Sequence, residues 1–385
     1  MPRRKNKRPN GDGNIRQRSN GRWEVQYTDP NTGKRYSHSE ATQANALRFL
    51  DEVKAQMRAG TWAAPSDMTV GDWITTWLES RRRGPQAIQP GTWAKYEANC
   101  RVHILPSLGR VRLHKLTRAM CQQFINKLEC APKTVRNIAG TLTKALNDAF
   151  DAELIPRNPA EHLRLPGIVH KPPVVMDTDT ERMFEAEFKK SPYGNIYAFA
   201  LGSGMRISEV LGLRWRDVDM QTGEVRVNGQ LERSYNGADR RRKDTTKTHR
   251  DRAPIMPPYV IDILKAERTR QTERRLLAGE MWNNPDGFVF TREDGSPMPH
   301  RTVEHAFGRI AERLGHPEVT LHCLRRTNIT DRVHDGDDVK VIADAVGHSS
   351  IAMTLGTYTG TRPEDLRRSA DRQQRRHDTQ NRPDQ

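Results

Sequence analysis

The chain has 385 residues, which is too long for one compact core, so two or three domains are expected. It is 35% hydrophobic and 29% charged, and its formal net charge is +16. A basic excess of this size favours a polyanionic partner, because lysines and arginines that bind phosphates release counterions. The alternative is a highly charged globular protein that has no such partner.

The cysteines and the apolar runs exclude several classes of protein. Four cysteines are present without CxxC pairs or zinc-finger spacing, so neither disulfides nor structural zinc is expected. The basic N-terminus has no apolar run behind its charges, so no secretory signal is predicted. No segment approaches the roughly 18 consecutive apolar residues of a membrane span. We therefore expect a protein of the reducing cytoplasm.

Residues 1–13 are basic and glycine-rich, and we predict a disordered tail there. Residues 14–62 are predicted to form a small module of three strands followed by a helix, with a two-residue hairpin turn at Asn20-Gly21. The basic side chains of this sheet are Arg16, Arg18, Arg22, Lys34 and Arg35. They favour a β-module that reads DNA, and the alternative is an ordinary sheet with a charged solvent face.

The segment 68–165 has helical periodicity and is predicted to form an all-α domain of four or five helices. Thr69 is placed to cap the first helix, and Pro106 is expected to stop the second, which we start at Thr92. The longest helix carries an apolar stripe that runs to Phe150. We interpret these stripes as core.

A proline-rich linker is predicted at 157–173, and a mixed α+β domain at 174–370. This domain is expected to contain a capped helix, a helix that includes Arg206, a strand pair and further helices. The strand pair is placed around GEVRVNG and RAPIMP, and two of the later helices at 258–278 and 300–314. Residues 371–385 are polar and are predicted to be disordered.

Arginines of the last domain suit the chemistry of a phosphodiester. A phosphodiester under attack becomes more negative, and preorganised donors must meet the added charge. Arg206 and Arg325 are the candidates, since a guanidinium can fork onto a non-bridging oxygen. Arg206 begins a helix whose N-terminal N–H groups also attract anions. His322 lies three residues before Arg325, on the same helix face.

Tyr358 is the candidate nucleophile, because its hydroxyl can hold a phosphate covalently. Its phenol, with a pKa of about 10, needs a nearby acceptor or cations, and either His322 or His348 is placed to help. The departing 5′ oxygen needs a proton, for which Lys247 in a hairpin is the candidate acid. Each of these short motifs, taken alone, is more often a surface ion pair, a turn or a packing residue than a functional site. Their joint occurrence, in order, on a basic chain is far more specific.

These stretches resemble the tyrosine recombinase, or phage integrase, family. GMRISEVLGLRW is similar to the family's first box, which implies that Arg206 is catalytic and Glu209 supports it. HCLRR resembles the HxLR box, and this resemblance implies catalytic roles for His322 and Arg325.

Two further stretches extend the resemblance. GHSSIAMTLGTY is similar to the ending of the family, which implies roles for His348 and Tyr358. KTHRDRAPI resembles its β-hairpin pattern and assigns the acid to Lys247, with Lys243 on the same hairpin face as the alternative. The match looks closest to actinobacterial phage or integrative-plasmid integrases.

The resemblance implies a multidomain fold that is mainly α with small β parts. In this interpretation 14–62 is an arm-type DNA-binding β-module, 68–165 is an all-α core-binding domain and 174–370 is a mixed α+β catalytic domain. The partners would be double-stranded DNA attachment sites, further copies of the chain in a tetramer on DNA, and an accessory DNA-bending or excision factor. The place of action would be the nucleoid in the cytoplasm of a bacterial host.

The implied mechanism needs no metal, nucleotide or other cofactor. Tyr358 attacks a scissile phosphate and forms a 3′-phosphotyrosine, which the 5′-OH of a partner strand then displaces. Such an enzyme integrates a phage or mobile element into a chromosome. The alternatives are a DNA-relaxing enzyme similar to type IB topoisomerases and a catalytically inactive DNA-binding regulator. A metal-dependent nuclease is disfavoured, because no carboxylate cluster is evident in the sequence.

Overall fold

The structure is a computed structural model that describes residues 13–30, 32–59, 62, 67–169, 172–233, 242–244, 251–357, 367, 370–371 and 373–377. The chain divides into two compact units, Met1–Val169 and His170–Gln385. The division falls within the proline-rich stretch that we expected to be a linker. No helix in the described ranges is long and apolar enough to cross a membrane.

The first unit begins with a three-stranded antiparallel sheet in the order β1-β2-β3. The strands are β1 (Asn14–Gln17), β2 (Trp23–Thr28) and β3 (Arg35–Glu40), and helix α1 (Gln43–Arg58) follows. Thr42 caps α1 by accepting a hydrogen bond from the N–H of Asn45. A small core joins sheet and helix, with Val25 and Ala46 fully buried. The three strands and the helix are those predicted from the sequence.

The same unit contains the helical part of the chain, which has a core of its own. Its longer helices are α2 (Val70–Arg82), α3 (Pro90–Asn99), α5 (Arg118–Asn126) and α6 (Pro132–Asp151). Thr69 caps α2 in a capping box with Asp72, as its sequence position predicts. Trp77 of α2 and Leu142 of α6 are among the buried side chains of this core.

Pro106 does not stop the second helix, contrary to the sequence-based expectation. The helix starts at Pro90 and passes through a π-helical turn (Cys100–Ile104) into α4 (Leu105–Leu108). Pro106 then stands at the start of α4, directly after this π-helical turn. The widened turn before it removes the clash that a proline causes inside a regular helix.

Phe150 does not belong to the apolar stripe of α6, because its side chain is 48% exposed. The buried stripe continues instead through Ala145 and Leu146 to Ala149. Phe150 lies in the last turn of the helix, one position beyond that stripe, so it points away from the core.

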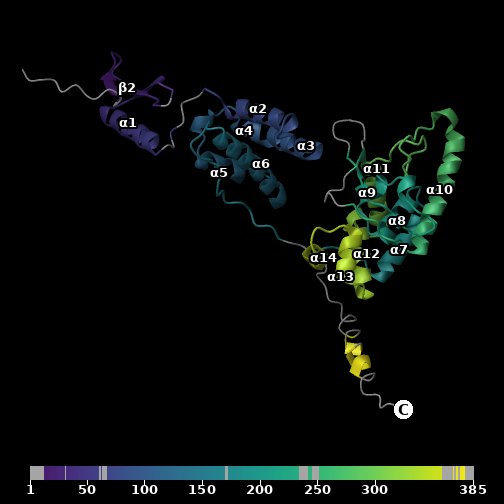
Figure 1. Cartoon of the computed structure of the whole chain (residues 1–385). Helices are drawn as coiled ribbons and strands as arrows, with labels where there is room; N and C mark the ends of the chain where they lie inside the picture. The colour runs from purple at the N-terminus through teal and green to yellow at the C-terminus, as the bar shows by residue number, and fades with distance from the viewer. Residues whose placement is uncertain are drawn as a thin grey trace, which may run out of the picture. The chain divides into compact units, whose positions relative to one another are not determined.

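The second unit is built around α8 (Gly194–Ser203), which is apolar on all sides and packs against four other helices. Figure 1 shows α8 among these neighbours. They are α7 (Thr178–Phe188), α9 (Ile207–Leu211), α10 (Pro258–Ala278) and α12 (Leu321–His334). The unit also contains α11 (His300–Arg313), α13 (Val339–Val346) and α14 (Ile351–Thr357). Aromatic side chains such as Tyr197, Phe199 and Phe307 fill its core.

The predicted strand pair of this unit is present as isolated antiparallel bridges. Glu224 pairs with Ile255 and Val227 with Arg252. A further short antiparallel pair joins β4 (Gln230–Leu231) to β5 (Arg242–Lys243). Of the C-terminal residues predicted to be disordered, the structure describes 371 and 373–377, which are helical.

Candidate active site

A tight turn places Arg206 beside the centre of the second unit. Helix α8 ends at Gly204, which has the left-handed conformation (φ 62°) that favours glycine. A Cβ at this position would also clash with the side chain of Asn328 on α12. The chain then turns so that Arg206 is the residue immediately before α9.

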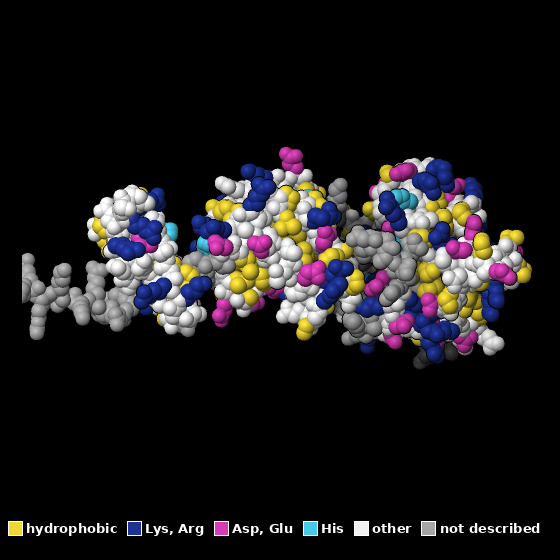
Figure 2. Space-filling view, turned by 90° about the horizontal axis from the view of Figure 1, so that it is seen from above, with side chains coloured by type: hydrophobic (Ala, Val, Ile, Leu, Met, Phe, Trp, Pro, Cys, Tyr) yellow, Lys and Arg dark blue, Asp and Glu magenta, His cyan; other side chains and the backbone are white. Residues whose placement is uncertain are grey.

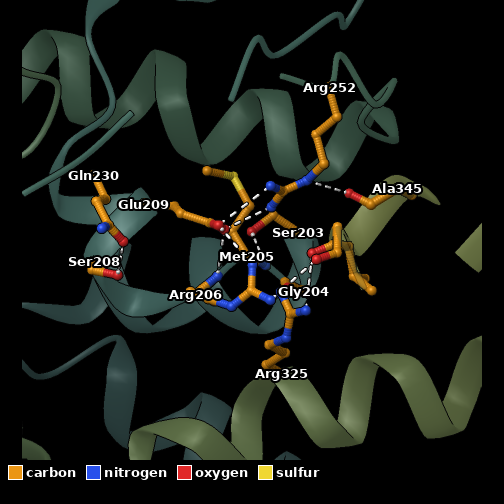
Figure 3. Close-up of polar contacts among 12 residues, drawn as sticks. Ser203, Gly204, Met205, Arg206, Ser208, Glu209, Gln230, Arg252, Arg325 and Ala345 are labelled. Atoms are coloured by element: carbon orange, nitrogen blue, oxygen red, sulfur yellow. Dashed lines mark hydrogen bonds and ion pairs between the residues drawn. The ribbon is translucent and has the colours of Figure 1, made fainter. Parts of the chain in front are cut away.

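Three arginines from different parts of the unit donate to three consecutive backbone carbonyls at the end of α13 (Figure 3). The pairs are Arg252 with Ala345, Arg325 with Val346 and Arg206 with Gly347, at 2.8, 2.9 and 3.1 Å. The last carbonyls of a helix have no intrahelical partner and carry the negative end of the helix dipole. This helix end therefore gathers positive charge at one point.

Glu209 lies between two of these guanidiniums (Figure 3). Its carboxylate accepts from Nη1 of Arg206 at 2.9 Å and from Nη2 of Arg252 at 2.6 Å. Burial alone would raise the pKa of Glu209, but the hydrogen bond and charge of Arg252 and the charge of Arg206 outweigh it and hold that pKa below its ordinary value. Glu209 is therefore a buried anion that fixes two cations.

Glu209 also accepts from the backbone N–H of Arg206, at 3.0 Å. We expected the N–H groups at the start of this helix to attract a DNA anion. That expectation is wrong for the N–H of Arg206, because the chain supplies its own carboxylate there. The guanidinium of Arg206, rather than this N–H, stays the group that we predict to bind a phosphate.

Arg325 is 3% exposed and is held between the ends of two helices. Its Nη1 donates to the carbonyl of Gly204 at 2.8 Å, after α8, and its Nη2 to that of Val346, in α13. Burial and then the charge of Arg206 lower the pKa of Arg325 to about 9, although the charge of Glu209 opposes this shift. The guanidinium thus stays charged at neutral pH, in a fixed orientation.

Two histidines lie beside these cations. Desolvation and the charges of Arg326, Arg325 and Arg206 lower the pKa of His322, although its side chain still reaches solvent. Burial, and then the charges of Arg325 and Arg206, lower the pKa of His348 to about 4. Both rings are therefore neutral at pH 7, so each has one N–H donor and one acceptor nitrogen.

The chain matches known proteins over most of these two units. Residues 177–365 match the family described as the phage integrase family. Residues 69–129 match the N-terminal SAM-like domain of phage integrases. The chain belongs to the phage integrase family of tyrosine recombinases. Enzymes of this family cleave and rejoin DNA.

Individual relatives of the recombinase cover nearly its full length. A protein named "Tyrosine recombinase XerC-like" from Caldanaerobacter subterraneus is 29% identical over 348 residues, which are 84% of this chain and 87% of that protein. The integrase of Mycobacterium phage L5 is 23% identical over 368 residues, 90% of this chain and 92% of that protein. The likeness to an integrase of an actinobacterial phage agrees with the resemblance noted from the sequence.

Solved structures of other integrases share the fold of the recombinase. The Tn1549 transposon integrase, solved with transposon right end DNA, has a TM-score of 0.65 at 21% identity and covers 79% of this chain and 99% of that chain. A lambda integrase tetramer bound to a Holliday junction has a TM-score of 0.58 at 17% identity and covers 91% of this chain and 96% of that chain. These likenesses support the multidomain, mainly helical fold.

The structure describes most of the site residues predicted for the recombinase and brings them together around α13. These residues are Arg206, Glu209, His322, Arg325 and His348. Lys247 and Tyr358 lie outside the described residues. The alternative acid, Lys243, is described on β5, where it pairs with Gln230. Among the described residues no cluster of three or more His, Cys, Asp or Glu side chains is arranged to hold a metal ion.

Sequence reasoning missed two residues of this site. Arg252 stands within KTHRDRAPI, but the sequence interpretation assigns it no role. The feature that could have indicated it is a charged side chain in a predicted strand, which in the structure pairs with buried Val227. Thr354 stands within GHSSIAMTLGTY, and its Oγ1 lies 2.7 Å from Nδ1 of His348. The sequence feature that could have indicated Thr354 is its position four residues before Tyr358, which corresponds to about one helical turn.

Proposed function

We propose that the chain is a site-specific DNA recombinase that cleaves and rejoins DNA through a 3′-phosphotyrosyl intermediate and so integrates a phage or mobile element into a chromosome. The observation that carries the proposal is the cluster of Arg206, Arg325 and His348 at one helix end, in a chain of the phage integrase family. A phosphodiester is the substrate class that such a concentrated, fixed positive charge fits.

Arg206 and Arg325 are proposed to bind the non-bridging oxygens of the scissile phosphate. Both guanidiniums are already oriented by backbone carbonyls, and Glu209 orients Arg206 in addition. Little reorganisation is then needed when negative charge grows in the pentavalent transition state, which is the condition for effective electrostatic catalysis.

The chemical step follows from this arrangement. Oη of Tyr358 attacks the phosphorus, loses its proton and forms a phosphotyrosine with the 3′ end, while the bond from phosphorus to the 5′ oxygen breaks. Lys247 gives that oxygen its proton. The 5′-OH of a partner strand then attacks the phosphotyrosine and releases Tyr358. One ester is exchanged for another at each step, so no external energy source is needed.

The neutral histidines complete the proposed site without adding charge. A neutral imidazole can donate to a phosphate oxygen or accept the phenol proton of Tyr358, whereas an imidazolium can only donate. His322 precedes Arg325 by one helical turn, and His348 follows the helix end that holds the arginines. We place both as hydrogen-bonding partners of the reacting groups.

The proposed DNA contacts are divided among the parts of the chain. We assign 14–62 to arm-type sites, 68–165 to the core site and 174–370 to catalysis. Figure 2 shows lysine and arginine side chains on the visible face of both units. On the β-module, Glu24 holds Arg16 at 2.6 Å and also pairs with Arg18, so two exposed arginines are fixed on one sheet face. Fixed arginines of this kind suit binding to phosphates and base edges.

Other copies of the chain are the further partners that we propose. Lambda integrase, which has the same fold, was solved as a tetramer on a Holliday junction. A tetramer on two attachment sites would supply four nucleophiles for two rounds of strand exchange. An accessory DNA-bending or excision factor would set the direction of the reaction. The host nucleoid in the cytoplasm is the proposed place of action.

A nicked suicide substrate tests the chemistry. Cleavage next to the nick releases a short fragment whose 5′-OH diffuses away, so a covalent protein–DNA band accumulates. We expect this band from the wild-type chain in the presence of EDTA and none from Tyr358→Phe. A Tyr358→Phe chain that still forms the adduct, or a wild-type chain that forms none, would contradict the proposal. Religation without exchange between two sites would instead support a topoisomerase-like enzyme, which the relatives do not favour.

A further inference from the structure

The contact between His348 and Thr354 joins two segments of the site. His348 follows α13, and Thr354 lies on α14, the helix that directly precedes Tyr358 in sequence. Oγ1 of Thr354 is 2.7 Å from Nδ1 of His348, which is the length of a good hydrogen bond. Thr354 is 0% exposed, so no bulk solvent competes for this contact.

The direction of the hydrogen bond follows from an accounting of donors and acceptors. A threonine hydroxyl has one proton to donate, and a buried donor without an acceptor costs free energy. Among the described residues, His348 is the side chain that forms a hydrogen bond with this hydroxyl. No backbone carbonyl of the described residues accepts a hydrogen bond from the hydroxyl. If Nδ1 carried the imidazole proton and donated, the hydroxyl proton would be left without an acceptor there. Among the described residues, donation from the hydroxyl to Nδ1 is therefore the arrangement that satisfies both groups.

This direction assigns the proton of the ring. A neutral imidazole with an acceptor at Nδ1 carries its proton at Nε2. Among the described residues, the charged and titratable groups that act on the ring are Arg325, Arg206 and Arg252, together with the ring of His322. They keep the imidazole neutral, so the tautomer, rather than the charge, decides what the ring offers to DNA. An Nε2–H group suits a phosphate oxygen, which can only accept.

We propose that Thr354 is a positioning residue that fixes His348 in the tautomer with Nε2–H and so aims a hydrogen-bond donor at the scissile phosphate. The inference rests on the proposed function, because it assumes that a phosphodiester is cleaved at this site. Thr354 does not touch the substrate and acts through His348. The same contact connects α14, the helix that precedes Tyr358 in sequence, to the C-terminal end of α13, whose carbonyls hold the arginines.

Two substitutions separate the hydroxyl from the shape of the side chain. Thr354→Val keeps the branched shape and removes the donor, and Thr354→Ser keeps the donor and removes a methyl group. We expect Thr354→Val to slow single-turnover cleavage of the nicked substrate on the order of 10- to 100-fold, as for misplaced catalytic groups, with unchanged DNA binding. Thr354→Ser should cleave at close to the wild-type rate. Equal rates for wild type and Thr354→Val, or an equal loss in both variants, would overturn the proposal.

A double-mutant cycle tests whether Thr354 acts through His348. In a His348→Ala background, Thr354→Val should cause no further loss of cleavage, because the group that it positions is gone. A merely structural threonine would give losses that multiply, and that result would refute the positioning role. If wild type itself forms no covalent adduct, the proposed function fails, and this outcome is distinct from a failure of the inference.

A measurement on the unmutated chain covers the case in which Thr354→Val does not fold. Nitrogen NMR of histidine-labelled protein, with His348→Gln to assign the signals, reports which ring nitrogen carries the proton. We expect the proton of His348 on Nε2 and an accepting Nδ1 at pH 7. A proton on Nδ1 would overturn the assignment, whatever the behaviour of the variants.

Discussion

Nη2 of Arg252 lies 2.6 Å from Oε2 of Glu209, and this ion pair is shielded from solvent, with side-chain exposures of 8% and 0%. The pair joins the strand segment of Arg252, which pairs with Val227, to helix α9, which follows Arg206. Arg252 also donates to Ala345. One buried carboxylate thereby connects three segments that are distant in sequence, and it does so without being a reacting group itself.

Glu209→Gln should destabilise the catalytic unit strongly. The substitution leaves the guanidiniums of Arg206 and Arg252 facing each other without the anion, and loss of one partner of a buried pair costs about 3–5 kcal/mol. Chemical denaturation measures the change. Glu224→Gln is the matched control, because Glu224 and Arg226 form an exposed pair at 2.8 Å. Similar effects of the two substitutions would mean that the buried pair has no special role.

Arg206→Lys should slow strand cleavage more than it weakens DNA binding. A lysine keeps the charge but cannot reach both Glu209 and a phosphate with a planar fork, and loss of one preorganised donor costs on the order of 10²–10³ in rate. Covalent adduct formation and gel-shift affinity measure the two quantities separately. Arg325→Lys should behave in the same way. Parallel losses in binding and cleavage would assign these arginines to ground-state binding.

The stability of the DNA-free catalytic unit should fall as the pH drops from about 6.5 toward 4. Burial lowers the pKa of His348 from an ordinary 6.5 to about 4, so in this window the unfolded chain takes up a proton and the folded chain does not. The contribution of His348 is therefore fully present above pH 6.5 and is lost as the pH falls through 4. The free energy of unfolding of His348→Gln should depend less steeply on pH. An unchanged slope would place the ring in a more solvated environment.

Lys247→Ala should be slow on ordinary DNA and largely restored on a 5′-bridging phosphorothiolate. Sulfur leaves readily without a proton, so the general acid becomes dispensable. Arg325→Lys should not be restored to the same degree, because its partner is a non-bridging oxygen. Lys243→Ala is the control on the same hairpin. Restoration in Lys243→Ala alone would reassign the acid, and restoration in neither would leave water or His348 as the proton source.

Deletion of residues 1–62 should leave cleavage of a core-site suicide substrate intact. The sheet and α1 have their own small core, and the helical part, which starts with α2 at Val70, has a separate one. Integration that depends on flanking arm sequences should be lost. Normal recombination of full-length sites by the shortened chain would show that the arm-binding assignment is wrong.

Local patterns predicted most elements of the fold. Thr69 is a capping signal that depends on neighbours in sequence, and it caps α2 as expected. Pro106 was misjudged because proline breaks a regular helix, whereas a preceding π-helical turn tolerates it. That turn is in contact with α6, and a local pattern does not contain this contact.

The prediction of the site residues from the sequence has a similar limit. Motif spacing singled out Arg206, His322, Arg325 and His348, because reacting groups occur in recognisable boxes. Arg252 escaped notice since its partner, Glu209, lies 43 residues away in sequence. Thr354 escaped because its position four residues before Tyr358 does not show which group its hydroxyl contacts, and that group is the ring of His348.

The shared helix end has a consequence for how the enzyme is switched off. Arg206, Arg252 and Arg325 are all held by the last carbonyls of α13, a helix of 8 residues. If the final turn of this helix unwinds, all three guanidiniums lose an anchor in the same event, and His348 moves with them. After such unwinding the guanidiniums would keep only their contacts with Glu209 and with the carbonyl of Gly204. A chain that opens chromosomal strands would thereby avoid half-assembled states that could cleave without rejoining.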